Sequence, residues 1–418
     1  MTGRRLAAAT LATCLLLAVS GCPVDGEPAP EPSESAAPAP PALPTDASTD
    51  LPAYGGPPDE VPASVGPVTR VQAAVDLTPA TPGLFTRVVS AVATPDGAYA
   101  VLSPADRDVA QSLVTVRGDA ITATMPLPRV DDVWGMHLLT DGSVLVAGRL
   151  GEGGHGLRIV DPASGAVRTT VVVAGEDGAV SAVGRSALVD GATTAYLFVS
   201  VEGDEQTREV LAAVDVASGR VVAERDLGTD VAAASRYPVG RQLAGLVARP
   251  EGGATLVFDA SPTEVAEDRI PTVLTYDADL RPVGEPVRVT DLAEGAETQS
   301  VAGAADGTVF LLVVVREGAW VLGVPDGGGA GPLLAQLEDR VYGYALAVEP
   351  AQVWAVLPAP TGALAVDLTT GETRGPLPVG CAPRLDVRNV YPAPGGALMI
   401  GECDTPRADT QLLWFLSP

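Results

Sequence analysis

VDPASG at residues 160–165 returns as VDVASG at 214–219 and as VDLTTG at 366–371. In each copy one short apolar run precedes the Asp and another follows the Gly. The Asp side chain can accept a hydrogen bond from the backbone two residues on, and Gly adopts the left-handed conformation that a tight turn requires. Looser copies stand at 276–279 and 116–119. Each copy therefore predicts a turn between two antiparallel strands.

A second turn, most often Asp-Gly, alternates with the first. Its central positions are 96, 141, 190, 251, 306, 351 and 395. Asp-Gly favours a tight hairpin because both residues tolerate positive φ. The sixth copy, Pro350-Ala351-Gln352, has neither residue and is identified by its spacing alone. The two turns and the apolar runs between them give seven units of four short strands, about 50 residues each. This pattern predicts an all-β, seven-bladed β-propeller with four-stranded antiparallel blades.

The seventh unit is one strand short. Its predicted strands are 388–394, 396–401 and 411–416, after which the chain ends at 418. The apolar run 68–77 at the front of the repeat region has no partner of its own. We expect this run to add the fourth strand to the last blade, because an open ring would leave exposed strand edges.

The composition restricts the possible partners. The 26 basic and 52 acidic residues give a net charge of −26 and a pI of about 4.3. Such a chain repels phosphate backbones, so we expect no nucleic-acid partner. Two His and four Cys are too few for an ordinary His/Cys metal centre, and we expect no metal and no cofactor. We expect a monomer.

The first residues predict export. Arg4 and Arg5 precede an apolar run, 6–19, that is shorter than the roughly 20 residues of a membrane-spanning helix. The run ends in Val-Ser-Gly-Cys at 19–22, which resembles the bacterial lipobox. This resemblance implies a lipoprotein signal peptide at 1–21 and a Cys22 that carries fatty acyl chains such as palmitate. The alternative is an ordinary signal peptide with an incidental Cys. The lipobox implies an extracytoplasmic protein, lipid-anchored to the outer leaflet of the cell membrane.

The amino-acid composition changes after Cys22. Residues 23–66 contain twelve Pro and eight acidic residues but no basic one. A segment of this kind cannot bury enough apolar surface to offset its chain entropy. Residues 22–66 are thus predicted to be a disordered tether, stiffened by Pro and extended by like charges, and 67–418 to be the propeller domain.

The repeated turns resemble those of the YVTN and quinoprotein-like β-propeller superfamily. The resemblance covers most of 67–418 and implies the propeller fold, which in this superfamily serves enzymes and non-enzymatic binding scaffolds alike. Quinoprotein dehydrogenases carry a Trp two residues after the turn Gly, where this chain has Val167, Val221 and Thr373. This departure argues against the quinone-binding branch.

Loops between blades and after the second strand of each blade share one face of a propeller, and ligands usually bind there. The candidate ligand-face residues are Arg107, Asp131, Asp132, Trp134, His137, His155, Arg340 and Tyr342. Over all the loops of this face acidic residues outnumber basic ones, which favours cations or basic partners; a solvated acidic rim is the alternative. The further acidic residues include Asp106, Asp108, Glu152, Glu202, Asp204 and Glu205. Asp131, Asp132 and His155 could form a metal or general-base site at the channel mouth. Alternatively, His155 is a solvated loop residue, and His137 is hydrogen-bonded in the inner wall.

Cys381 and Cys403 fall in two loops of that face, one before the seventh blade and one after its second strand. Propeller geometry places these loops side by side, so outside the cytoplasm we expect a disulfide; two free thiols are the alternative. Cys14 leaves with the signal peptide.

Two classes of function stay open. No nucleophile elbow, phosphate-binding loop or Cys/His metal spacing is present, so no catalytic residue is assigned. The predicted inner strands are mostly Ala, Val, Leu and Gly; they are 86–93, 134–139, 242–249, 298–304 and 344–349. This composition favours a binding or scaffold module for an envelope protein, peptide or glycan over a propeller enzyme of lactonase or sugar-processing type. A third possibility is an assembly subunit that uses its blade edges.

Overall fold

The structure is a computed structural model of the chain. It describes residues 68–80, 86–104, 109–128, 130–150, 154–175, 179–189, 191–203, 207–228, 230, 241–260, 270–289, 292, 296–315, 318–326, 333–337, 345–348, 354–359, 362–381, 384–404 and 409–418. The chain divides into two compact units, Met1–Leu43 and Pro44–Pro418, and every described residue lies in the second. Among these residues no helix is long and apolar enough to span a membrane.

The described strands form seven four-stranded antiparallel sheets, which we number as blades 1 to 7 in chain order. Blade 1 contains β2 (Thr86–Thr94), β3 (Gly97–Pro104), β4 (Gln111–Arg117) and β5 (Ala120–Leu127). Blade 2 contains β6 (Asp131–Leu138), β7 (Val144–Arg149), β8 (His155–Val160) and β9 (Val167–Ala174). Blade 3 contains β10 (Ala179–Ala187), β11 (Thr194–Gly203), β12 (Thr207–Asp215) and β13 (Arg220–Asp226).

The remaining blades repeat the same order. Blade 4 contains β14 (Arg241–Ala248), β15 (Ala254–Ala260), β16 (Ile270–Tyr276) and β17 (Val287–Arg288). Blade 5 contains β18 (Glu297–Gly303), β19 (Val309–Val315), β20 (Gly318–Val324) and β21 (Leu333–Leu337). Blade 6 contains β22 (Ala347–Val348), β23 (Trp354–Ala359), β24 (Gly362–Asp367) and β25 (Thr373–Pro378). Blade 7 contains β26 (Arg384–Ala393), β27 (Gly396–Asp404), β28 (Asp409–Ser417) and β1 (Arg70–Asp76).

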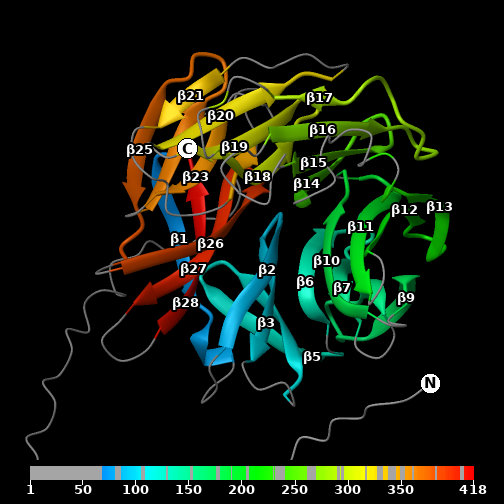
Figure 1. Cartoon of the computed structure of the whole chain (residues 1–418). Helices are drawn as coiled ribbons and strands as arrows, with labels where there is room; N and C mark the ends of the chain where they lie inside the picture. The colour runs from blue at the N-terminus through cyan, green and yellow to red at the C-terminus, as the bar shows by residue number, and fades with distance from the viewer. Residues whose placement is uncertain are drawn as a thin grey trace, which may run out of the picture. The chain divides into compact units, whose positions relative to one another are not determined.

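The first strands of the blades form a closed ring (Figure 1). Each first strand contacts that of the next blade, from β2 through β6, β10, β14, β18 and β22 to β26, and β26 contacts β2 again. The all-β, seven-bladed propeller predicted from the repeated turns is thereby confirmed.

Apolar side chains fill the space between neighbouring blades. The described residues form seven buried clusters, one between each pair of adjacent sheets. Middle strands are therefore covered on both faces, and every residue of β3 and of β23 is buried. The outermost strand β5 instead alternates exposed and half-buried residues. Burial on both faces explains why the sequence shows short continuous apolar runs rather than a strict alternation.

The ring closes as predicted, because β1 pairs with β28 along its whole length, from Arg70 opposite Ser417 to Asp76 opposite Leu412. The three strands predicted for the last unit correspond to β26, β27 and β28, each of which is longer than predicted.

The repeated turns have the expected geometry. The carboxylate of Asp161 accepts a hydrogen bond from the N–H of Ala163 at 2.9 Å, and Asp367 accepts one from Thr369 at 2.7 Å. The closing Gly165 and Gly371 have φ of 72° and 73°, in the left-handed region. Hydrogen bonds from backbone N–H groups hold the pKa of both carboxyls below its usual value. The degenerate turn around Ala351 lies outside the described residues.

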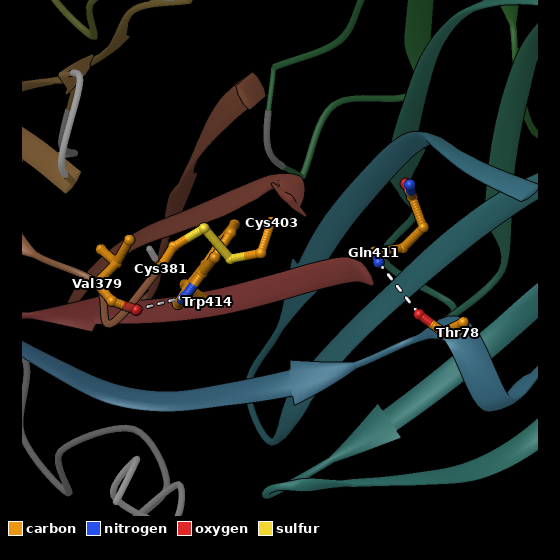
Figure 2. The surroundings of a disulfide bond; sticks show 6 residues. All are labelled: Thr78, Val379, Cys381, Cys403, Gln411 and Trp414. Atoms are coloured by element: carbon orange, nitrogen blue, oxygen red, sulfur yellow. Dashed lines mark hydrogen bonds between the residues drawn. A yellow bond between two sulfur atoms is a disulfide. The ribbon is translucent and has the colours of Figure 1, made fainter. Parts of the chain in front are cut away.

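Cys381 and Cys403 form a disulfide with a Cα–Cα distance of 5.6 Å (Figure 2). The predicted pairing is correct, but Cys403 is a buried residue of β27 rather than part of a loop. Close to the disulfide, the indole N–H of Trp414 donates to the carbonyl of Val379 at 3.1 Å. These contacts fasten the segment that leads into blade 7 onto the blade itself.

Polar side chains link one blade to the next. The backbone N–H of Val88 in β2 donates to the side-chain oxygen of Gln411 in β28 at 3.0 Å. The N–H of Val130, just before β6, donates to Gln111 of β4 at 2.9 Å in the same manner. We call these two contacts the glutamine links. They tie blade 7 to blade 1 and blade 1 to blade 2.

Candidate functional site

Six of the seven first strands carry a β-bulge near their beginning, judged on the residues that the structure describes. The shifts in register follow Val88, Asp131, Ala179, Leu243, Thr298 and Val387. An extra residue in one strand interrupts the ladder and re-aims side chains, and bulges are common beside binding sites. All six strands begin at the same end of the ring, so the bulges surround one end of its axis. We call this end the mouth.

The largest of these bulges is in β6. Asp131 pairs with Arg149, whereas Gly135 pairs with Ala147, so three residues bulge where the partner strand has one. Asp132, within the bulge, has φ of 48°. The bulge lies against Gly148, where a Cβ atom would be 2.6 Å from a methyl carbon of Val130. The sequence thus holds Asp132 in a left-handed conformation that is uncommon outside glycine.

A cavity of about 530 Å³ opens at the mouth, between the first strands of blades 7, 1 and 2. We call it the mouth cavity. Its lining consists of Arg87, Val88, Val89, Asp132, Val133, Trp134, Arg388 and Asn389. Each of these side chains lies in or beside one of the bulges. The volume falls within the range of about 300–1,000 Å³ that is typical of small-ligand sites.

Three charged side chains line the mouth cavity among the residues that the structure describes, and one of the three has a partner within those residues. Arg388 donates to Glu402 of β27 at 2.5 Å. Arg87 and Asp132 are exposed, and neither forms an ion pair or side-chain hydrogen bond with any residue in the described ranges. In this described lining, one guanidinium and one carboxylate are therefore exposed without a described partner.

Trp134 forms one wall of the cavity. Its indole stacks on the imidazole of His155, with ring centroids 5.8 Å apart and an interplanar angle of 20°. The six-membered ring lies over Gly184 of β10, where a Cβ atom would be only 2.2 Å from Cε3. Because Gly184 leaves this room, Trp134 can fill the gap between blades 2 and 3.

The expected loop position of His155 is wrong. His155 is the first residue of β8 and is 2% exposed. It lies opposite Arg149, which in turn lies opposite Asp131. The described residues contain no group of three or more His, Cys, Asp or Glu side chains placed to hold a metal ion. A strand position beneath an indole ring gives His155 a packing role, so the interpretation as a solvated loop residue is also wrong.

His137 belongs to the opposite end of the ring. Its Nε2 lies 3.0 Å from Oγ of Ser186 in β10. Gly135 makes this contact possible, since a Cβ there would be 2.1 Å from the same oxygen. Burial lowers the pKa of His137 to about 4, so the imidazole is neutral near pH 7. The predicted hydrogen bond of His137 in the inner wall is confirmed.

His137 and Ser186 line a second cavity of about 460 Å³, which we call the floor cavity. The rest of its lining is apolar: Ala187, Leu188, Val189, Leu246, Val247, Ala248, Pro250, Val301, Gly303, Ala304, Ala305, Val348 and Pro392. A neutral imidazole beside a hydroxyl is the arrangement of a nucleophile and its base. Within the described part of the chain, however, no second side chain hydrogen-bonds the imidazole to orient it.

The structure brings together only part of the predicted ligand face. Asp132 and Trp134 line the mouth cavity, whereas His137 lines the floor cavity. Arg107, Arg340 and Tyr342 lie outside the described residues. Sequence reasoning missed Arg87, Arg388, Asn389 and the valines of the mouth. The polar pair Arg388-Asn389 within an inner-strand run was the available signal for this site.

Comparisons with known proteins support the fold. No protein-family model matches the chain, and no curated protein matches it either. An oligogalacturonate lyase in complex with manganese is similar in structure, with a TM-score of 0.54 and 12% identity over 84% of this chain and 96% of that one. The β-propeller domain of Cps50 (Swd1) from Myceliophteria thermophila has a TM-score of 0.50 and 11% identity over 79% of this chain and 96% of that one. At such identities the likeness shows the propeller fold alone.

Proposed function

We propose that this protein is a lipid-anchored, extracytoplasmic binding module that holds an envelope protein, peptide or glycan at the mouth of its propeller. The mouth cavity is the observation that carries the proposal. It is lined by three blades and combines two guanidinium groups, a carboxylate, an amide and an indole around about 530 Å³. Ligand sites typically combine apolar walls with a few convergent polar groups of this kind.

Export and anchoring rest on the sequence, with support from the disulfide. The lipobox-like Val-Ser-Gly-Cys at 19–22 gives Cys22 the role of the acylated residue. The Pro-rich, acidic stretch 23–66 then acts as a tether that keeps the propeller away from an anionic membrane. A disulfide between Cys381 and Cys403 is what an oxidising compartment outside the cytoplasm produces.

The repeated turns support a place among the YVTN and quinoprotein-like propellers, as a branch that binds no quinone. Both the hydrogen bonds of Asp161 and Asp367 and the left-handed glycines that close their turns fit this proposal. In a branch without the Trp contacts, the glutamine links would join two pairs of blades.

Catalysis is the alternative, as a propeller enzyme of lactonase or sugar-processing type. The hydrogen bond between His137 and Ser186 is the observation that favours it. This pair lies in the floor cavity, however, at the end of the ring opposite the mouth. The described residues that line the mouth cavity include no histidine. We therefore place binding first.

The test uses the full-length chain in detergent and a panel of purified envelope glycans, peptides and proteins. We expect at least one probe to bind the native chain and to lose tenfold or more in affinity in Arg87→Gln. Arg281→Gln is the matched control, because Arg281 is an exposed arginine on a turn of blade 4. Mass spectrometry of the bound probe reports turnover. An affinity that is unchanged in Arg87→Gln, or chemical conversion of a bound probe, would overturn the proposal.

A further inference from the structure

The two exposed charges of the mouth cavity are opposite in sign and held apart. Arg87 extends from β2 and Asp132 from the bulge of β6, on neighbouring blades. They form no ion pair with each other, nor with any other residue that the structure describes. Two opposite charges that face one cavity without pairing leave room for a ligand to stand between them.

The guanidinium of Arg388, the third described charge of the lining, is paired within the protein. Arg388 is committed to Glu402 at 2.5 Å, and the side chain of Glu402 is only 15% exposed. This pair contributes no net charge, so the unpaired charges among the described lining residues are one positive and one negative. An anionic ligand would pair with Arg87 but would be repelled by Asp132. A cationic ligand would pair with Asp132 but would be repelled by Arg87.

The backbone conformation of Asp132 is set before any ligand binds. Its φ of 48° is a conformation that an L-residue adopts at a cost in energy, and the packing of the bulge over Gly148 maintains it. A backbone that is already in place loses little conformational entropy when the residue binds a ligand. Strained backbone conformations cluster at ligand sites, which agrees with a role of Asp132 in the mouth cavity.

The neutral part of the lining suits a short peptide. Val89 and Val133 supply apolar contacts, and Asn389 adds an amide group. We propose that the mouth cavity binds a short zwitterionic peptide, with its carboxylate on Arg87 and its ammonium group on Asp132. This inference rests on the proposed function and specifies the class of ligand.

Three pools of mixed-sequence tripeptides test the proposal: unblocked, amino-acetylated and carboxyl-amidated. Equilibrium dialysis against the full-length chain in detergent, read by mass spectrometry, shows which members are retained. We expect retention from the unblocked pool alone, and a loss of tenfold or more in affinity in both Arg87→Gln and Asp132→Asn. Asparagine tolerates a left-handed φ, so Asp132→Asn removes the charge and keeps the bulge. Arg281→Gln and Asp279→Asn, at an exposed ion pair in blade 4, are the matched controls.

Each charge must act on its own end of the peptide. Members amidated at the carboxyl end, tested at high concentration, should be insensitive to Arg87→Gln, and acetylated members should be insensitive to Asp132→Asn. A blocked pool that binds as tightly as the unblocked one, or an Asp132→Asn chain that binds like the native one, overturns the zwitterionic ligand. If another probe still binds through Arg87, the binding module stands without this inference. If no probe of any class binds, both proposals fail.

Discussion

Val88 and Gln411 are 323 residues apart in sequence, yet the backbone N–H of Val88 donates to the side-chain oxygen of Gln411 at 3.0 Å. The backbone of Gln411 also holds the segment after β1, since its N–H donates to the hydroxyl of Thr78 at 3.1 Å (Figure 2) and its carbonyl accepts from Leu77 at 2.8 Å. One residue of the last blade therefore fixes both the closing strand β1 and the first strand of blade 1.

Replacing Gln411 should weaken the closed ring. In Gln411→Ala the buried N–H of Val88 loses its acceptor, which costs about 1–3 kcal/mol of unfolding free energy. Urea denaturation, followed by circular dichroism, measures this loss. Gln336→Ala, at an exposed glutamine of β21, is the matched control and should change stability little. Equal stability of the two variants would show that the link does not support closure.

The disulfide should stabilise blade 7. Cys381 and Cys403 close a loop with a sequence separation of 22, so their joint replacement by Ala should cost about 3 kcal/mol through the freedom gained by the unfolded chain. Thermal unfolding of the double variant and the native chain checks the size of the effect. Non-reducing peptide mapping should recover the two cysteines in one cross-linked species; recovery of both as free thiols would contradict the pairing.

His137 should make folding sensitive to mild acid. Burial lowers its pKa to about 4, whereas an unfolded histidine titrates near 6.5. As pH falls through this interval the unfolded chain takes up the proton first, so stability decreases, by on the order of 2 kcal/mol, and this group adds no further loss below pH 4. The unfolding free energy at pH 7.5 and at pH 4.5 should differ less in His137→Gln than in the native chain. Identical differences would exclude this role.

A tyrosine between blades 3 and 4 should make folding sensitive to alkali. Tyr276 donates to Asp230 at 3.2 Å, and Asp230 also binds Arg225, whose guanidinium lies 5.7 Å from the tyrosine ring. Burial raises the pKa of Tyr276 well above its usual value. Its contribution to stability is therefore complete below pH 10, and is lost as pH rises through the folded-state pKa.

Tyr276→Phe tests this contribution. The variant should lose about 1 kcal/mol at pH 7, because one hydrogen bond is removed, and should show a shallower decline in stability above pH 10 than the native chain. Urea unfolding at pH 7, 9 and 11 separates the two effects. A decline as steep as that of the native chain would assign the alkaline sensitivity to other groups.

Cys22 should decide where the protein is found. Cys22→Ala removes the residue that the lipobox-like motif marks for acylation, so the full chain should move from the membrane fraction to the soluble fraction. It should also lose incorporation of an alkyne-labelled fatty acid. Cys14→Ala is the control within the signal segment and should keep the membrane location. A Cys22→Ala chain that stays in the membrane fraction would refute the lipid anchor.

The mouth of the propeller was only partly predictable from sequence. Asp132 and Trp134 stand out as polar and aromatic residues near the start of a predicted inner strand. Arg87 could not be recognised in the same way, because nothing in its local sequence shows that β2 lies beside β6 and β26 at one cavity. His155 shows the opposite case. Its glycine-rich surroundings predict a loop, whereas packing against Trp134 makes it a buried strand residue.

The sequence by itself determined the repeat, and with it the number of blades and the strand that closes the ring. It could do so because turns and apolar runs depend on the φ preferences of Asp and Gly and on burial along a few neighbouring residues. Only the tertiary structure decided which side chains share a cavity. The bulges arise from pairing between strands, and Arg87, Asp132 and Arg388 meet because blade 7, distant in sequence, packs beside blades 1 and 2 around one axis.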